Sequence, residues 1–137
     1  MAEFVMKDML RREGVEGVEI ESAALHTDEI GNDIHHGTRR KLIAEGIPFS
    51  PRRAWLLTRD KVRAYDLIIG MDGENMRDLR RLLCGEDAGK ARSLLSFAGR
   101  GGEVADPWYT GDFEATYRDV VDGCRGLISF LRENGYV

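Results

Sequence analysis

The sequence predicts an α/β domain with a parallel sheet, and two observations carry that prediction. Segments with helical periodicity alternate with short apolar runs along the chain. One of these runs, "YDLIIGM" at 65–71, has the continuous apolar centre that is typical of a strand buried on both faces of a sheet. Strict alternation of helix and strand favours parallel strands with helices packed against them.

Size and composition fit one globular domain over residues 1–137. The chain is 42% hydrophobic and 32% charged, and its net charge of −4 argues against a general binder of nucleic acid or anionic membrane. No apolar run approaches the ~18 residues of a membrane span, and no secretory leader is recognisable, so we expect a cytoplasmic protein. Cys84 and Cys124 lack metal-binding spacing, and we expect both to be small buried residues.

The first half of the chain begins directly on a helix. Phe4, Val5, Met9 and Leu10 form one apolar stripe, and Gly14 is a plausible stop. The elements expected after it are a strand at 18–24 ("VEIESAA"), a helix at 32–46 and a short helix at 58–65 capped by Thr58.

The second half continues the alternation. After the strand at 65–71 we expect a helix at 72–85 capped by Asp72, a strand at 90–99 and a closing helix at 111–135 capped by Asp112. The stretch 98–112, "AGRGGEVADPWYTGD", is the one long irregular segment. Segments of that length in compact domains are usually functional or mobile.

The opening helix bears on function. In a βαβ unit a strand precedes the first helix, and ligand sites lie at the carboxyl ends of strands beside helix N-termini. The expected position of an anion site is therefore immediately before Met1.

The order of segments resembles the low-molecular-weight protein tyrosine phosphatase family. The likeness is carried by "AEFVMKDML", "ESAA" followed by "EIGND", "GIPFSPRRAWLLT", "YDLIIGMDGENMRDL" and "DPWYTGDFEATYRDVVDGCRGLISFL". The resemblance implies a three-layer fold with a four-stranded parallel sheet in the order 2-1-3-4. It also implies a Cys-x5-Arg-Ser-Pro loop before a helix that often reads Met-Ala-Glu. Because this chain begins at Met-Ala-Glu, we expect its central first strand and that loop to be absent.

The resemblance also implies roles for five residues. Asp106 is the expected general acid and base, Trp108 and Tyr109 are the expected walls of the phosphotyrosine cleft, and Ser22 is expected to support the phosphate loop. Asp28 stands on the expected cleft rim, where the family often has Tyr or Trp. Without the resemblance, Asp106 before a proline is an ordinary turn residue and Ser22 an ordinary strand-end hydroxyl. No cofactor is implied, and the expected substrate is a phosphotyrosine protein or a small aryl phosphate.

Three interpretations follow. The leading one is a phosphatase-family chain that lacks its nucleophile loop, is inactive as written and self-associates through exposed strand edges. The others are a non-catalytic binding or regulatory relative and an arsenate reductase of similar fold. The last is disfavoured because "DPWY" supplies a phosphatase-type acid and no pair of redox cysteines lies in the middle of the chain. We expect His35 and His36 to face solvent rather than bind metal.

Overall fold

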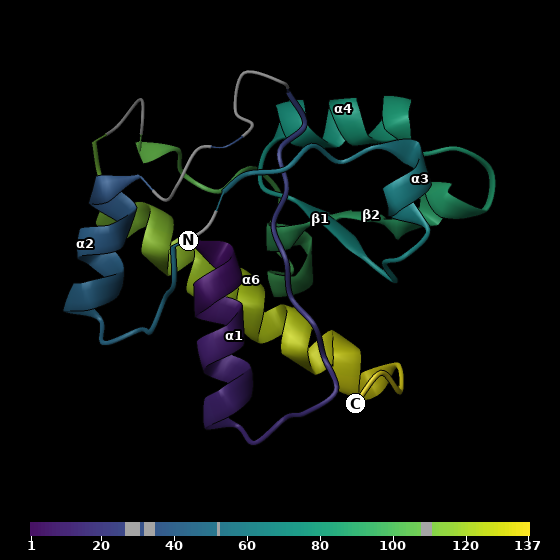
Figure 1. The fold of residues 1–137 in the computed structure, drawn as a ribbon. Helices are drawn as coiled ribbons and strands as arrows, with labels where there is room; N and C mark the ends of the chain where they lie inside the picture. Colours follow the sequence, from purple (N-terminus) through teal and green to yellow (C-terminus); the bar gives the residue numbers. More distant parts are fainter. Residues whose placement is uncertain (27–30, 32–34, 52, 108–110) are drawn as a thin grey trace.

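A computed structural model describes residues 1–26, 31, 35–51, 53–107 and 111–137 (Figure 1). Among the described residues its elements are α1 (Ala2–Arg12), α2 (His36–Ala44), α3 (Arg59–Val62), β1 (Ile68–Gly70), α4 (Gly73–Leu82), the 3₁₀ helix η2 (Gly85–Lys90), β2 (Ala91–Ser93), the 3₁₀ helix η3 (Leu94–Ala98) and α6 (Phe113–Glu133).

Strands β1 and β2 form a parallel pair in which Ile68 lies opposite Ala91 and Gly70 opposite Ser93. The sequence predicted both strands, but the second is much shorter than 90–99 because η3 begins at Leu94. Leu94 and Leu95 are both 1% exposed. Successive strand residues point to opposite faces, whereas the 3₁₀ turn directs both side chains into the core beneath α6.

The strand predicted at 18–24 is not formed, which corrects that prediction. The segment contributes only an isolated parallel bridge between Ala24 and Leu56. At that bridge the Ala24 N–H donates to Trp55 O at 2.7 Å and the Leu57 N–H donates to Ala24 O at 2.9 Å. A strand exists only where a neighbour supplies its ladder, so an alternating sequence is not sufficient to make one.

The helices α1 and α6 cross in the lower half of Figure 1 and enclose the main core. The buried residues that they and η3 contribute are Phe4, Val5, Met6, Leu10, Leu94, Leu95, Val120, Cys124, Leu127, Ile128 and Leu131. Two glycines bring α6 close to η3. A Cβ on Gly123 would lie 2.4 Å from Leu94 Cγ, and one on Gly126 would lie 2.0 Å from the Phe97 carbonyl oxygen.

Most of the predicted helix ends agree with the structure. Asp72 accepts the Asn75 N–H at 2.7 Å and Asp112 accepts the Ala115 N–H at 3.0 Å, so both act as N-caps. Thr58 precedes α3 as predicted, but its hydroxyl donates to the Asp60 carboxylate rather than capping the helix.

The two cysteines differ. Cys124 is buried, as predicted, whereas Cys84 is exposed, so the prediction that it is buried was wrong. Leu83, at the end of α4, enters a smaller core with Leu57, Val62 and Leu79, and the next residue faces out. His35 and His36 are exposed, as predicted, and the His35 Nδ1 accepts the Gly37 N–H at 3.1 Å.

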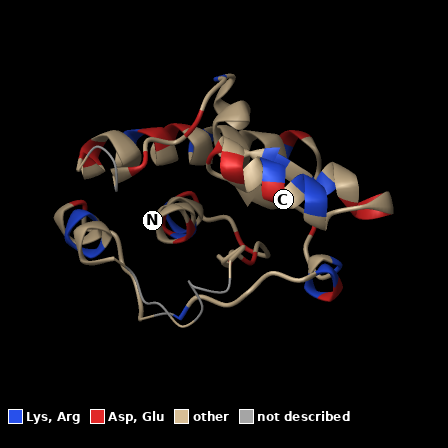
Figure 2. Ribbon diagram, turned by 90° about the horizontal axis from the view of Figure 1, so that it is seen from above, with Lys and Arg blue, Asp and Glu red and all other residues tan. Residues whose placement is uncertain are grey.

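Charged residues of both signs are intermixed along the helices (Figure 2). In α4, for example, Glu74 lies in the first turn and Arg80 and Arg81 in the last, which complements the helix dipole at both ends. Within the part of the chain that the structure describes, no helix is long and apolar enough to cross a membrane.

Candidate active site

The segment that carries Asp106 is tied at its start to the turn after β1. The Val104 N–H donates to Met71 O at 3.0 Å, and the Gly73 N–H donates to Glu103 Oε1 at 2.7 Å. Val104 is itself buried in the main core. The segment therefore starts at the carboxyl end of β1, which is the edge of a parallel sheet where ligand sites form.

A second attachment holds the residue next to Asp106. The Ala105 N–H donates to Asp119 Oδ2 at 2.9 Å, and the Thr116 hydroxyl donates to Ala105 O at 2.6 Å. Thr116 is 7% exposed and Asp119 also pairs with Arg100 at 3.0 Å. Both backbone polar groups of Ala105 are thus bonded to α6, so the position of the neighbouring Asp106 is set by that helix.

The expected site residues are only partly within the described structure. Asp106 is exposed. Trp108, Tyr109 and Asp28 lie outside the described residues. The Gly111 N–H donates to Pro107 O at 2.7 Å, which closes the segment just before the α6 cap.

Ser22 contacts the first turn of α1. Its hydroxyl donates to Glu3 Oε1 at 2.5 Å, and Glu3 also pairs with Lys7 at 2.7 Å. Ser22 therefore lies beside the helix N-terminus at which the sequence placed an anion site, although its partner here is a carboxylate of α1.

Neither cysteine of residues 1–137 has the environment of a phosphatase nucleophile. Burial raises the pKa of Cys124 to about 12, so its side chain is a thiol at neutral pH. Cys84 lies between α4 and η2, where it is the N-cap of a short 3₁₀ helix. The residue six positions after each cysteine is Lys90 or Phe130, so neither matches Cys-x5-Arg.

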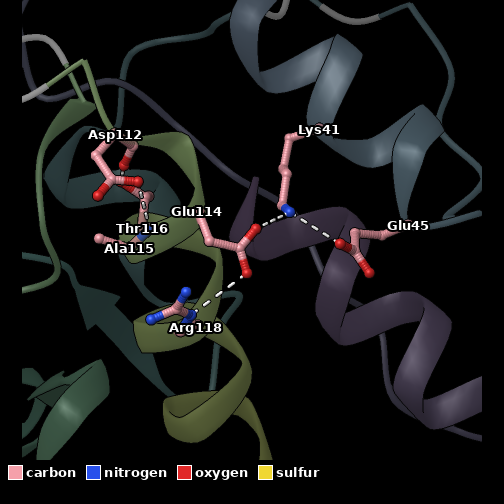
Figure 3. Close-up of polar contacts among 7 residues, drawn as sticks. All are labelled: Lys41, Glu45, Asp112, Glu114, Ala115, Thr116 and Arg118. Carbon is pink, nitrogen blue, oxygen red and sulfur yellow. Dashed lines mark hydrogen bonds and ion pairs between the residues drawn. The ribbon is translucent and has the colours of Figure 1, made fainter.

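An exposed ionic cluster joins α2 to the start of α6 (Figure 3). Lys41 lies between Glu45, at 2.8 Å, and Glu114, which also pairs with Arg118 at 3.3 Å. The hydrogen bond from Lys41 lowers the pKa of Glu114, and the same bond, with that to Glu45, raises the pKa of Lys41. The cluster braces the end of α6 that follows the Asp106 segment.

Sequence reasoning missed the attachment of Ala105 to α6. Its signal was present as Thr116 and Asp119, two polar residues one turn apart in an otherwise amphipathic helix. Threonine and aspartate on a half-buried face indicate that some backbone is bonded there. The sequence does not say which segment.

Comparisons with known proteins agree with this arrangement. Residues 1–136 match the family described as low molecular weight phosphotyrosine protein phosphatase. The low molecular weight protein-tyrosine-phosphatase YfkJ of Bacillus subtilis is 32% identical over 136 residues, which cover 97% of this chain and 87% of that protein.

Solved structures give the same result. The crystal structure of YfkJ superposes with a TM-score of 0.90 at 31% identity, covering 97% of this chain and 86% of that one. The low molecular weight protein tyrosine phosphatase SP-PTP of Streptococcus pyogenes gives 0.82 at 36% identity, covering 95% of this chain and 82% of that one. The α/β fold, the segment at the carboxyl end of β1 and these matches together show that the chain belongs to the low molecular weight phosphotyrosine protein phosphatase family.

Proposed function

We propose that this domain hydrolyses phosphate monoesters of tyrosine or of small phenols, with Asp106 as general acid. The observation that carries the proposal is the double attachment of Ala105, which presents an exposed carboxyl-bearing residue from a fixed backbone position. A phenolate has a pKa near ~10 and leaves poorly without a proton, so an acid fixed over the ester oxygen accelerates the reaction. After departure the same carboxylate activates water for release of the phosphoryl group.

The remaining machinery requires a thiolate and a cradle for the phosphoryl oxygens. Because residues 1–137 contain no Cys-x5-Arg, we propose that these residues alone do not turn over substrate. The nucleophile loop would stand at the N-terminus of α1, where helix N–H groups favour an anion.

The substrate-facing residues are proposed from the family pattern. Trp108 and Tyr109 follow Asp106 after Pro107 and would flank the aromatic ring, with Asp28 on the opposite rim. Ser22 would hydrogen-bond the phosphate loop, and its contact with Glu3 keeps it beside the first turn of α1. An acidic Asp28 in place of an aromatic residue favours substrates with a basic group near the phosphate.

We further propose that the complete sheet has four strands in the order 2-1-3-4. In the described residues β1 pairs with β2 alone, and segment 18–24 touches a neighbour only at Ala24. A strand between 18–24 and β1 would complete both ladders. Residues 1–137 alone would expose those edges and self-associate, which sedimentation at two protein concentrations measures.

The central experiment joins a family strand and Cys-x5-Arg-Ser-Pro loop to Met1 and compares its activity with residues 1–137. We expect activity only in the extended protein. If residues 1–137 are active alone and lose that activity in Cys84→Ser or Cys124→Ser, the proposal that they lack the nucleophile is overturned. A folded but inactive extended protein that still binds phosphotyrosine supports a binding module instead.

The role of Asp106 is tested in the extended protein with a series of leaving groups. Asp106→Asn keeps the shape and removes the proton, so it should slow phenyl phosphate far more than nitrophenyl phosphate, with a loss of ~10²–10⁴-fold for the poor leaving group. Asp66→Asn is the matched control, since Asp66 is exposed and precedes β1. An equal loss on every leaving group shows that Asp106 is not the acid.

A further inference from the structure

Three side chains with metal-binding atoms meet at the surface of α4. Glu74 and Asp78 are four residues apart on α4, so both carboxylates lie on one face of the helix. His26 reaches them from the segment after the Ala24 bridge. Their ligand atoms all lie within 4.8 Å of one another.

An ion fits after side-chain adjustment, in which the contact between His26 and Asp78 lengthens and the contact between His26 and Glu74 shortens. The His26 Nε2 lies 3.0 Å from Asp78 Oδ2 and 3.7 Å from Glu74 Oε1. In a tetrahedral site with bonds of about 2.0–2.1 Å, neighbouring ligand atoms are roughly 3.3 Å apart. Rotation of exposed side chains supplies the adjustment, because His26 is 53% exposed and Glu74 is 63% exposed.

One atom of the cluster points to a ligand independently of the spacing. Asp78 Oδ2 is sealed from solvent, and among the described residues it lies 3.0 Å from His26 Nε2 without accepting a hydrogen bond of acceptable geometry. A buried carboxylate oxygen without such a partner is costly. An ion held against His26 Nε2 and this oxygen removes that cost.

Both sides of the cluster are fixed by the backbone. Two hydrogen bonds hold Ala24 against Trp55 and Leu57, only two residues before His26. Asp72 caps the first turn of α4, two residues before Glu74. The three donors are therefore presented from anchored positions, which lowers the ordering cost of binding.

We propose that His26, Glu74 and Asp78 form a binding site for a divalent transition-metal ion such as Zn²⁺. One imidazole nitrogen with two carboxylate oxygens suits zinc, with water in the fourth position. Mg²⁺ and Ca²⁺ prefer all-oxygen sites, so they compete poorly here. The ion would hold His26, and with it the segment after Ala24, against α4. His26 is two residues before Asp28 on the proposed cleft rim.

The test measures Zn²⁺ binding to the 137-residue chain by titration calorimetry and by the rise in Tm. A Cys84→Ser background removes the exposed thiol, which would bind zinc by itself. We expect one site. His26→Ala and Glu74→Gln should each weaken zinc more than the roughly 10–100-fold typical of losing an outer-shell partner. His36→Ala is the matched control, because His36 is also an exposed histidine, and it should bind zinc normally.

A second readout does not depend on stability. In imidazole ¹H–¹⁵N spectra, added Zn²⁺ should shift the Nε2 of His26 and leave His36 unchanged, while added Mg²⁺ at the same concentration should shift neither. Unchanged zinc affinity in both His26→Ala and Glu74→Gln overturns the site, as does an equal response of His26 and His36. In that outcome His26 only pairs with the carboxylates of Glu74 and Asp78.

Discussion

Two regions of the molecule have similar apolar content but differ in regular secondary structure. One is the layer formed by α1 and α6, and the other is the segment from Gly14 to Leu25. The helices bury long rows of side chains, from Phe4 to Leu131, in one core. The segment sets Val18 and Ile20 only part-buried against that core and has no strand of its own. A helix satisfies its backbone internally, whereas a strand needs a partner, so the same apolar content gives different structures.

The largest effect should come from truncating a buried side chain in the main core beneath α6. Leu94→Ala removes a side chain that is 1% exposed beneath α6, and should lower the free energy of unfolding by about 2–5 kcal/mol. Urea denaturation measures the change. Ile43→Ala is the control, because Ile43 is 63% exposed. Equal losses in the two variants would show that the α1–α6 layer is not the stabilising core.

The next effect comes from filling the contact between α6 and η3. A helical glycine replaced by alanine should stabilise by about 0.8–1.0 kcal/mol from propensity alone. At Gly126, however, the new Cβ would lie 2.0 Å from a backbone carbonyl oxygen. Overpacking costs about 1–3 kcal/mol and more against backbone, so Gly126→Ala should destabilise.

Gly101→Ala is the matched control, because nothing lies within 4 Å of its added Cβ. Thermal unfolding should show a lower Tm for Gly126→Ala and little change for Gly101→Ala. A higher Tm for Gly126→Ala would mean that α6 sits farther from η3 than described.

A smaller effect is expected in the segment from Gly14 to Leu25, which forms no helix or strand. Ile20 is only part-buried, so Ile20→Ala should cost about 1 kcal/mol, roughly half of the burial energy of a full isoleucine side chain. Joining the proposed central strand to Met1 should raise that cost toward the value for Leu94→Ala. A cost that stays the same in the extended protein would contradict the proposed neighbour for 18–24.

The smallest effect should come from the exposed ionic cluster. Glu114→Gln removes the partner of Lys41 at the start of α6, and at neutral pH the Tm should change within experimental error, since such pairs are screened by water. Because the folded pKa of Glu114 is lowered, its contribution exists above the unfolded pKa and is lost as pH falls through the folded pKa.

Lys41 has the opposite sign. Its pKa is raised, so its contribution is present below the unfolded pKa and is lost as pH rises through the folded pKa. Comparing the Tm of Glu114→Gln with that of the unchanged chain across acid, neutral and alkaline pH measures both. A large drop at neutral pH would show that the cluster is shielded from solvent.

The contrast between the two regions also explains what the sequence could predict. Helix starts at Asp72 and Asp112 and the long α6 follow from local signals, because caps and periodicity act within a few residues. The strand at 18–24 and the length of the strand after Lys90 depend on distant partners. The first prediction was wrong, and the second made the strand too long.

In the candidate site, too, local signals could be predicted from the sequence and long-range contacts could not. Asp106 was identified as a residue type at a position in a motif, and its role remains a prediction. The bonds from Ala105 to Thr116 and Asp119 join residues more than ten positions apart, and no local signal identifies such pairs. Exposure of Cys84 was missed because the burial of Leu83 decides which way the chain turns.

The attachment of Ala105 to α6 has a consequence for motion. A loop bonded on both polar groups of one residue shares the fluctuations of the helix that holds it, and local opening requires both bonds to break together. The Ala105 amide should therefore exchange with deuterium on the timescale of the α6 amides rather than that of a surface loop. On heating, the placement of Asp106 would persist until α6 itself opens, so the temperature at which Asp106 loses its position and the melting temperature of the helix become one quantity.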